Sequence, residues 1–138
     1  GCDSHRRDPL ADLNLTLDGQ RASYLALANL ADELCEGRWI SVGGGGYAVL
    51  NVVPRAWTHL LAIVSGEPID PATPVPDAWR AEAGESGAGE SGPLTMSDGA
   101  PATFRPFEEG FTPQSRVDQA IHATRQAVFP ELGIDPSL

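Results

Sequence analysis

The stretch that decides the fold covers residues 39–47 and reads W-I-S-V-G-G-G-G-Y. Its first part is a short apolar run, which is typical of an interior strand in a parallel sheet covered on both faces. Four glycines follow, and because glycine loses more conformational freedom on folding than any other residue, such a run needs a reason. A single aromatic residue, Tyr47, comes directly after them. The stretch therefore predicts a strand over residues 38–42 that ends in a glycine loop.

Helical patterns flank this strand. Residues 17–36 predict a helix with Thr16 as its N-cap, and residues 50–65 predict a second helix, in which Pro54 is tolerable only in the first turn. Asn51 is the expected cap of the second helix. The expected buried stripes are Tyr24, Leu27, Ala28, Ala31, Leu34 and Cys35 on the first helix, and Leu50, Val53, Trp57, Leu60, Leu61 and Val64 on the second. Helix, strand, glycine loop and helix make one unit of an α/β fold with a central parallel sheet, most of which must lie outside this chain.

The composition changes after the second helix, and we expect three regions. Residues 1–66 form the α/β part, and residues 67–112 are a Pro- and Gly-rich excursion that we expect to be partly disordered, with the repeat G-E-S-G-A-G-E-S-G in its middle. Residues 113–138 hold a last helix over about 115–128 and a tail. The chain is thus an α/β unit followed by an irregular C-terminal extension.

Composition narrows the class of protein. Hydrophobic residues make up 41% of the 138 residues, which is ordinary for a globular domain, and no apolar run approaches the length of about 20 residues that a membrane helix needs. The net charge is −10 and no basic face is visible, which argues against direct binding to nucleic acid. The two cysteines are too few for a disulfide scaffold, so we expect idle thiols in a reducing cytoplasm.

The glycine loop allows two interpretations. A glycine loop between strand and helix suggests phosphate binding at a helix N-terminus, but the specific phosphate-loop and dinucleotide patterns are missing. The plainer interpretation is a tight turn that lets the backbone pass close to a neighbour. Tyr47 favours a ligand site, because it follows the carboxyl end of a parallel strand and a protonated phenol can donate a hydrogen bond to a carbonyl oxygen that gains negative charge. Packing of Tyr47 on the following helix is the alternative.

Asp3-Ser4-His5 is the other candidate. The pattern Asp-x-His can present a carboxylate and an imidazole to a metal, although two such residues often occur together by accident. Ordinary loop capping by Asp3 with an exposed His5 is the alternative. His59 and His122 fall on predicted helices without metal-ligand spacing, so we expect them to be structural.

Three segments together resemble a known family. They are G-C-D-S-H-R-R-D-P-L at the start of the chain, S-V-G-G-G-G-Y, and A-W-T-H-L-L in the second helix. This combination is similar to the histone deacetylase family, and more narrowly to its bacterial acetoin-utilization branch. The later stretches D-P-A-T-P-V-P-D-A-W and V-D-Q-A-I-H-A-T-R-Q-A-V-F-P resemble the same branch.

The resemblance implies an arginase/deacetylase-like three-layer fold and a zinc-dependent, cytoplasmic deacetylase. It implies that Asp3 is a zinc ligand, that Tyr47 is the catalytic residue that polarises the acyl carbonyl, and that Gly45 and Gly46 line the acyl-lysine channel. The family's His pair and its first Asp-x-His do not occur here, so the chain resembles the C-terminal portion of the catalytic domain. Its partners would be the remainder of that domain and an acetylated protein or small acyl amide, and this portion alone would be inactive.

A different class of function stays open at this point. The chain could be a non-catalytic α/β binding module whose glycine loop takes a phosphate or a peptide.

Overall fold

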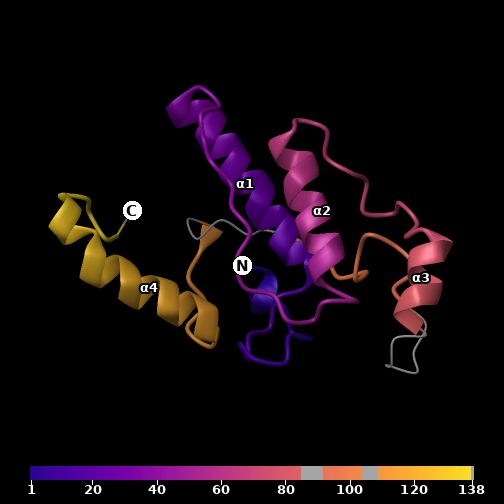
Figure 1. The fold of residues 1–138 in the computed structure, drawn as a ribbon. Helices are drawn as coiled ribbons and strands as arrows, with labels where there is room; N and C mark the ends of the chain where they lie inside the picture. Colours follow the sequence, from indigo (N-terminus) through magenta and orange to yellow (C-terminus); the bar gives the residue numbers. More distant parts are fainter. Residues whose placement is uncertain (85–91, 104–108, 138) are drawn as a thin grey trace. The chain divides into compact units, whose positions relative to one another are not determined.

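The computed structural model describes residues 1–84, 92–103 and 109–137, and it divides the chain into two compact units, Gly1–Ala102 and Thr103–Leu138 (Figure 1). The first unit contains the short 3-10 turn η1 (Cys2–Ser4) and the helices α1 (Leu17–Cys35), α2 (Val53–Val64) and α3 (Asp77–Ala83). The second contains α4 (Arg116–Val128) and the 3-10 turn η4 (Pro130–Leu132). Every candidate site residue lies in the first unit.

α1 begins and ends with local capping. The hydroxyl oxygen of Thr16 accepts a hydrogen bond from Gly19 N at 3.1 Å, so the predicted N-cap is confirmed. At the other end Glu36 and Gly37 both have positive φ, 54° and 74°, and Gly37 N donates to Ala31 O at 3.0 Å. This left-handed ending is the geometry that glycine favours, and it turns the chain away from the helix axis.

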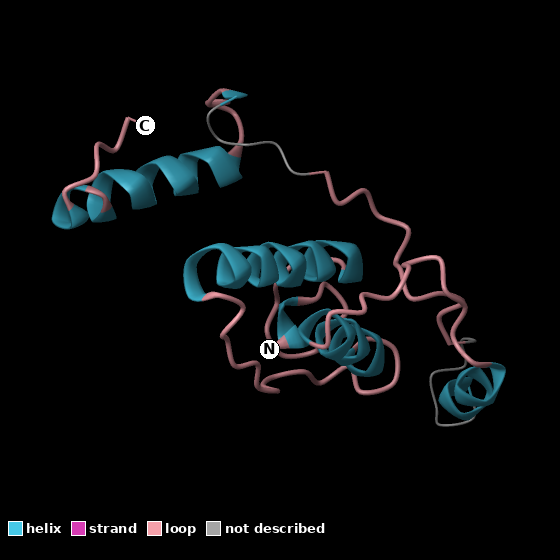
Figure 2. Cartoon of the chain, turned by 90° about the horizontal axis from the view of Figure 1, so that it is seen from above, coloured by secondary structure: helices cyan, strands magenta, loops and turns pink. Residues whose placement is uncertain are grey.

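α2 lies beside α1 and packs on the start of the chain (Figures 1 and 2). Pro54 sits in the first turn, as predicted, but the N-cap is Val52 and not Asn51, and no side chain caps this end. The apolar core is small and consists of Cys2, Leu17 and Ala56, with Val53 packed against it. The N-terminal loop, the start of α1 and the start of α2 therefore share one core.

The predicted central parallel sheet is wrong. Figure 2 shows helices joined by loops, and residues 38–42 take no strand conformation. A strand exists only through hydrogen bonds to a neighbouring strand, and within the described residues the bridges are two isolated ones, His5 with Leu15 and Pro74 with Thr95. The apolar run at 38–42 has no such neighbour, so Ile40 is 90% exposed. Neither an α/β class nor an arginase/deacetylase-like three-layer arrangement is supported.

The buried faces of α1 and α2 also differ from the predicted apolar stripes. On α1 the buried residues are Leu17, Asp18, Gln20 and Ala31, and on α2 they are Arg55, Ala56, His59 and Ile63. Leu27, Leu34 and Cys35 of the first predicted stripe are exposed, and so are Trp57, Leu61 and Val64 of the second. Half of the buried residues on each helix are therefore polar, and their side chains bind loops of the same unit.

The stretch 67–112 contains more structure than the predicted irregular excursion. It contains α3 and an antiparallel contact in which Val75 N donates to Leu94 O and Met96 N donates to Thr73 O, each at 2.9 Å. Residues 85–91 of the G-E-S-G-A-G-E-S-G repeat lie outside the described residues.

The helix predicted over residues 115–128 is confirmed as α4. The hydroxyl oxygen of Ser115 accepts from Asp118 N at 3.1 Å and caps its N-terminus. The guanidinium of Arg125 lies 4.9 Å from the ring centroid of Phe129, just beyond the helix. None of the helices in the described ranges combines the length and the apolar character that crossing a bilayer requires.

Candidate functional site

The glycine loop, residues 43–46, is joined to the turn that carries Asp3. Cys2 N donates to Gly45 O at 2.7 Å, and the Asp3 carboxylate lies directly against the Cα of Gly45. A Cβ at position 45 would overlap this carboxylate, and a Cβ at position 46 would come within 2.5 Å of Cys2 Sγ. The two loops therefore approach so closely that a side chain at either position would displace the side chain of Asp3 or of Cys2 and Val53.

This close approach accounts for three of the four glycines, because a Cβ at Gly44 would meet its neighbours only at 3.5 Å or more. At position 43 a Cβ would come within 3.0 Å of the Trp57 ring, so the indole of α2 also occupies space that a side chain would need. Of the two interpretations of the loop, the backbone passing close to a neighbour fits these contacts. Phosphate binding does not fit them, because the Asp3 carboxylate against Gly45 would repel an anion.

Asp8 joins the same two loops at a second point. Its Oδ2 accepts from Tyr47 N at 2.8 Å, and its Oδ1 accepts from Leu10 N and Ala11 N at 2.9 and 3.3 Å. Burial by itself raises the pKa of Asp8, but the hydrogen bonds from these backbone N–H groups outweigh it and hold the pKa below its ordinary value. An ionised Asp8 thus fixes the backbone of Tyr47.

From the sequence no role in the site was predicted for Asp8, although it stands in the segment G-C-D-S-H-R-R-D-P-L. The signal for a further role was present in the spacing, because the resemblance rests on a second acidic residue five positions after Asp3. What the spacing could not show is its partner, the N–H group of residue 47, which lies 39 positions away.

Asp3 and Tyr47, the two predicted site residues, thus belong to loops that two hydrogen bonds hold together. Asp3 is partly exposed in η1, and Tyr47 is 49% exposed with its backbone held by Asp8. A carboxylate and a phenol are therefore brought to neighbouring loops, both accessible from solvent. Their proposed chemistry as metal ligand and hydrogen-bond donor stays a prediction.

His5 is not the exposed residue that the plain interpretation expected. It is fully buried, its Nε2 lies 2.6 Å from Asp98 Oδ2, and its Nδ1 accepts from Arg7 N at 3.0 Å. Because Nδ1 accepts a hydrogen bond, Nε2 carries the proton and donates it to Asp98. Both ring nitrogens are occupied, so His5 has none left for a metal.

The described residues do not form a zinc site by themselves. Across residues 1–84, 92–103 and 109–137, no group of three or more His, Cys, Asp and Glu side chains could hold a metal ion. His59 Nε2 donates to Met96 O at 2.6 Å, and the His122 ring lies 5.3 Å from that of Phe111. Asp3 is a single carboxylate, whereas a catalytic zinc takes three protein ligands.

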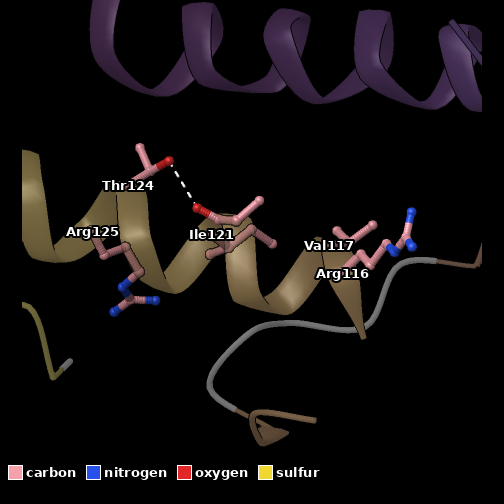
Figure 3. A pocket seen from close by; sticks show the side chains of 6 residues that line it. Arg116, Val117, Ile121, Thr124 and Arg125 are labelled. Carbon is pink, nitrogen blue, oxygen red and sulfur yellow. Dashed lines mark hydrogen bonds between the residues drawn. The ribbon is translucent and has the colours of Figure 1, made fainter. Parts of the chain in front are cut away.

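The hollow along α4 carries none of the predicted site residues. Its volume is about 470 Å³, and Figure 3 shows the side chains that line it, which are Arg116, Val117, Ala120, Ile121, Thr124 and Arg125. The hydroxyl of Thr124 donates to Ala120 O at 2.8 Å within the helix. The lining lacks acids, histidines and cysteines, so it offers no acid–base or nucleophilic chemistry.

Comparison with known proteins finds similarity in the first part of the chain. The histone deacetylase domain family matches residues 1–64. The chain is 40% identical over 79 residues to the acetoin utilization protein AcuC of Bacillus subtilis (strain 168), a match that covers 57% of this chain and 20% of that protein. It is 44% identical over 69 residues to the protein of the same name from Staphylococcus aureus (strain N315), covering 50% and 18%.

A third relative is the acetoin utilization protein AcuC of Staphylococcus xylosus, 39% identical over 80 residues, or 57% of this chain and 20% of that protein. The chain thus spans about a fifth of the length of the curated relatives that it matches. No solved structure matches the chain. The resemblance carried by the Asp3 loop and the glycine loop is confirmed.

Proposed function

Because residues 1–64 match the histone deacetylase domain family, we propose that this chain supplies part of the active site of a zinc-dependent deacetylase. In this proposal Asp3 contributes one zinc ligand and Tyr47 donates a hydrogen bond to the acyl oxygen of the substrate. The remaining zinc ligands come from residues of the same catalytic domain outside positions 1–138. The substrate is an acetyl-lysine side chain or a related acyl amide.

The joining of the two loops is the observation that carries this proposal. A carboxylate and a phenol can act on one bound group only if their loops stay together, and the hydrogen bonds Cys2 N to Gly45 O and Tyr47 N to Asp8 Oδ2 hold them so. The Asp3 carboxylate contacts Gly45, which precedes Tyr47 by two positions in the chain. This arrangement supports a shared site and disfavours the phosphate-binding module.

The chemistry that a bound zinc ion supplies to an amide hydrolase is polarisation of the acyl carbonyl and activation of the attacking water. The residues of this chain stabilise the developing charge and shape the site around the reacting acyl group. The phenol of Tyr47 donates its O–H to the acyl oxygen as negative charge develops there. Asp8 keeps the backbone of Tyr47 in place, and in this proposal the backbone of Gly45 and Gly46 lines the acyl-lysine channel.

Tyr47→Phe in the complete deacetylase tests the proposal. Removing one donor to a developing oxyanion lowers turnover by about 10²–10³, so we expect that loss in kcat on an acetyl-lysine peptide, with unchanged zinc content. Tyr24→Phe is the matched control, because Tyr24 lies on α1 as the chain's other tyrosine. We expect it to leave kcat unchanged.

Residues 1–138 assayed alone give the baseline, with neither turnover nor stoichiometric zinc expected, because a single carboxylate does not hold the metal. Full activity of the Tyr47→Phe protein would remove Tyr47 from the mechanism. Turnover by residues 1–138 alone would show that the proposed division of the site is wrong.

A further inference from the structure

The segment Thr95–Ala100, here called the 95–100 segment, lies beyond the part of the chain that matches the family, yet it is bound to that part. Its central residue is Asp98, whose side chain is 8% exposed. Oδ2 of Asp98 accepts from His5 Nε2 at 2.6 Å and from Leu17 N at 3.1 Å, and Oδ1 accepts from an Arg55 nitrogen at 2.9 Å. One carboxylate thus joins the N-terminal loop, α1 and α2.

The backbone of the 95–100 segment is held independently of the Asp98 side chain. Asp18 of α1 accepts from the Ser97 hydroxyl at 2.6 Å, from Asp98 N at 3.0 Å and from Ala100 N at 3.1 Å. Arg55 donates to Thr95 O and Ser97 O at 3.3 and 3.0 Å. The segment would therefore stay in place when the Asp98 side chain alone is changed, which makes the function of that carboxylate separable by mutation.

From Asp98 the contacts lead to Asp3 through His5. The His5 backbone N donates to Cys2 O at 3.3 Å and closes the η1 turn, in which Asp3 is the middle residue. Gln20 of α1 supports the same turn by donating to Cys2 O and to the Ser4 hydroxyl at 3.0 and 2.9 Å. The His5 side chain, anchored on Asp98, and the His5 backbone, which closes η1, thus connect Asp98 to the turn that carries Asp3.

We propose that Asp98 is a positioning residue for Asp3: by accepting the Nε2 proton of the buried His5, it fixes the η1 turn against the glycine loop. The proposal rests on the proposed function, since positioning matters only if Asp3 acts at a site. Asp98 itself touches neither substrate nor metal in it.

The charges of Asp98, His5 and Arg55 favour the hydrogen bond from His5 to Asp98. His5 is buried with its Nδ1 accepting a hydrogen bond, so its ring is neutral and the positive charge opposite Asp98 comes from Arg55. Burial by itself raises the pKa of Asp98, but the hydrogen bonds from Leu17, His5 and Arg55 lower it to about 2. Asp98 is therefore an ionised acceptor at neutral pH, and hydrogen bonds to an ionised acceptor are the strong ones.

Hydrogen exchange of residues 1–138 tests the positioning directly, with Asp98→Asn compared with Asp18→Asn. Asp98→Asn leaves one neutral acceptor oxygen for three donors, those of His5, Leu17 and Arg55, and sets an NH₂ group against at least one of them. We therefore expect the Cys2 amide, which pairs with Gly45 O, to exchange about tenfold faster or more. Asp18→Asn weakens the anchoring of the same segment while leaving Asp98 and His5 paired. We expect it to speed exchange at Asp98 and Ala100, with little change at Cys2.

If Asp98→Asn fails to fold, two variants of His5 test the same hydrogen bond from its other side. His5→Gln retains an N–H donor for Asp98, whereas His5→Phe retains a flat ring and loses the donor. We expect fast exchange of the Cys2 amide in the Phe variant and near-normal exchange in the Gln variant. Equal exchange at Cys2 in both variants, or in the Asp98 and Asp18 variants, would overturn the positioning role.

Zinc affinity and kinetics of the complete deacetylase separate this proposal from the proposed function. Loss of an outer support of a metal ligand commonly costs about 10–100-fold in metal affinity or activity, so we expect Asp98→Asn to lower zinc affinity and kcat more than it changes KM. If Tyr47→Phe lowers turnover but Asp98→Asn leaves the Cys2 amide and zinc affinity unchanged, the positioning role fails alone. If Asp98→Asn loosens the loop and Asp3→Ala leaves zinc affinity unchanged, the proposed function fails.

Discussion

The two ends of α1 lie in opposite environments. At its N-terminal end Leu17, Asp18 and Gln20 are buried, and the two polar ones bind the 95–100 segment and the η1 turn. Toward its C-terminal end Leu27 and Leu34 are 54% and 72% exposed. The same helix therefore buries charged and polar side chains at one end and exposes leucines at the other.

α2 repeats this contrast across its two faces. Arg55 and His59 are buried and bind the 95–100 segment, while Leu61 on the other face is 70% exposed beside a hollow of about 250 Å³. Hydrophobicity alone would predict the reverse. The difference teaches that burial in this unit follows the availability of a partner segment. The polar side chains have such a segment within the described residues, whereas Leu27, Leu34 and Leu61 do not.

The largest effect that would test this contrast is expected from Arg55→Ala. Arg55 is 3% exposed and binds Asn51, Thr95, Ser97 and Asp98, so its removal leaves a buried carboxylate and buried carbonyls unpaired. We expect a loss of about 3–5 kcal/mol in the free energy of unfolding of residues 1–138, measured by urea titration.

Arg38→Ala is the matched control for Arg55→Ala. Arg38 also pairs with a carboxylate, Glu36, at 2.8 Å, but both side chains are largely exposed, at 74% and 81%. We expect a change within about 0.5 kcal/mol, because exposed ion pairs contribute little. A similar cost for the two arginines would mean that the buried network does not carry the stability of this end of the molecule.

A smaller difference is expected between two leucines of α1. Leu17→Ala empties a fully buried position in the small apolar core and should cost about 2–4 kcal/mol in the same titration. Leu34→Ala removes a side chain that is 72% exposed and should change the stability by about 0.5 kcal/mol or less. If Leu34→Ala proved as costly as Leu17→Ala, the C-terminal end of α1 would be packed in solution, and the contrast between the ends would fail.

The local parts of this fold could be predicted from the sequence. Thr16 and Ser115 cap their helices through hydrogen bonds to residues three positions on, and Pro54 falls in a first turn, so each signal and its partner lie within one short window. The strand over 38–42 could not be settled this way. An apolar run becomes a strand only beside another strand, and whether a neighbour exists is not a property of the run.

The candidate site likewise has a part that local motifs predict and a part that depends on residues distant in sequence. Asp3, Gly45, Gly46 and Tyr47 could be proposed as site residues because their motifs are local and specific in sequence. The pairing of His5 with Asp98 spans 93 positions, and no local sequence pattern links the two residues. His5 was therefore expected to be exposed, Arg55 and Asp98 were given no role, and the network of buried polar side chains was missed.

The smallest of the expected effects is an acid-dependent loss of stability in the buried network. Asp98 has a pKa of about 2 in the folded protein, below the ordinary value of 3.8 that it takes when unfolded. Between these values the unfolded state binds the proton first, so the stabilisation is complete above the unfolded pKa and is lost as pH falls through the folded one. The shift corresponds to about 2 kcal/mol.

Urea titrations of residues 1–138 at a series of pH values from about 5 down to about 2 measure this loss. We expect Asp98→Asn to start less stable than the unaltered chain at the upper end and to fall less steeply, so that the gap narrows with acid. Asp77→Asn is the control, since the Asp77 side chain is 97% exposed in its pair with Arg80 and should leave the slope unchanged. If the unfolding free energies of Asp98→Asn and the unaltered chain changed in parallel with pH, the ionised Asp98 would not stabilise the N-terminal end of α1. Asp18 and Arg55 would then hold that end without it.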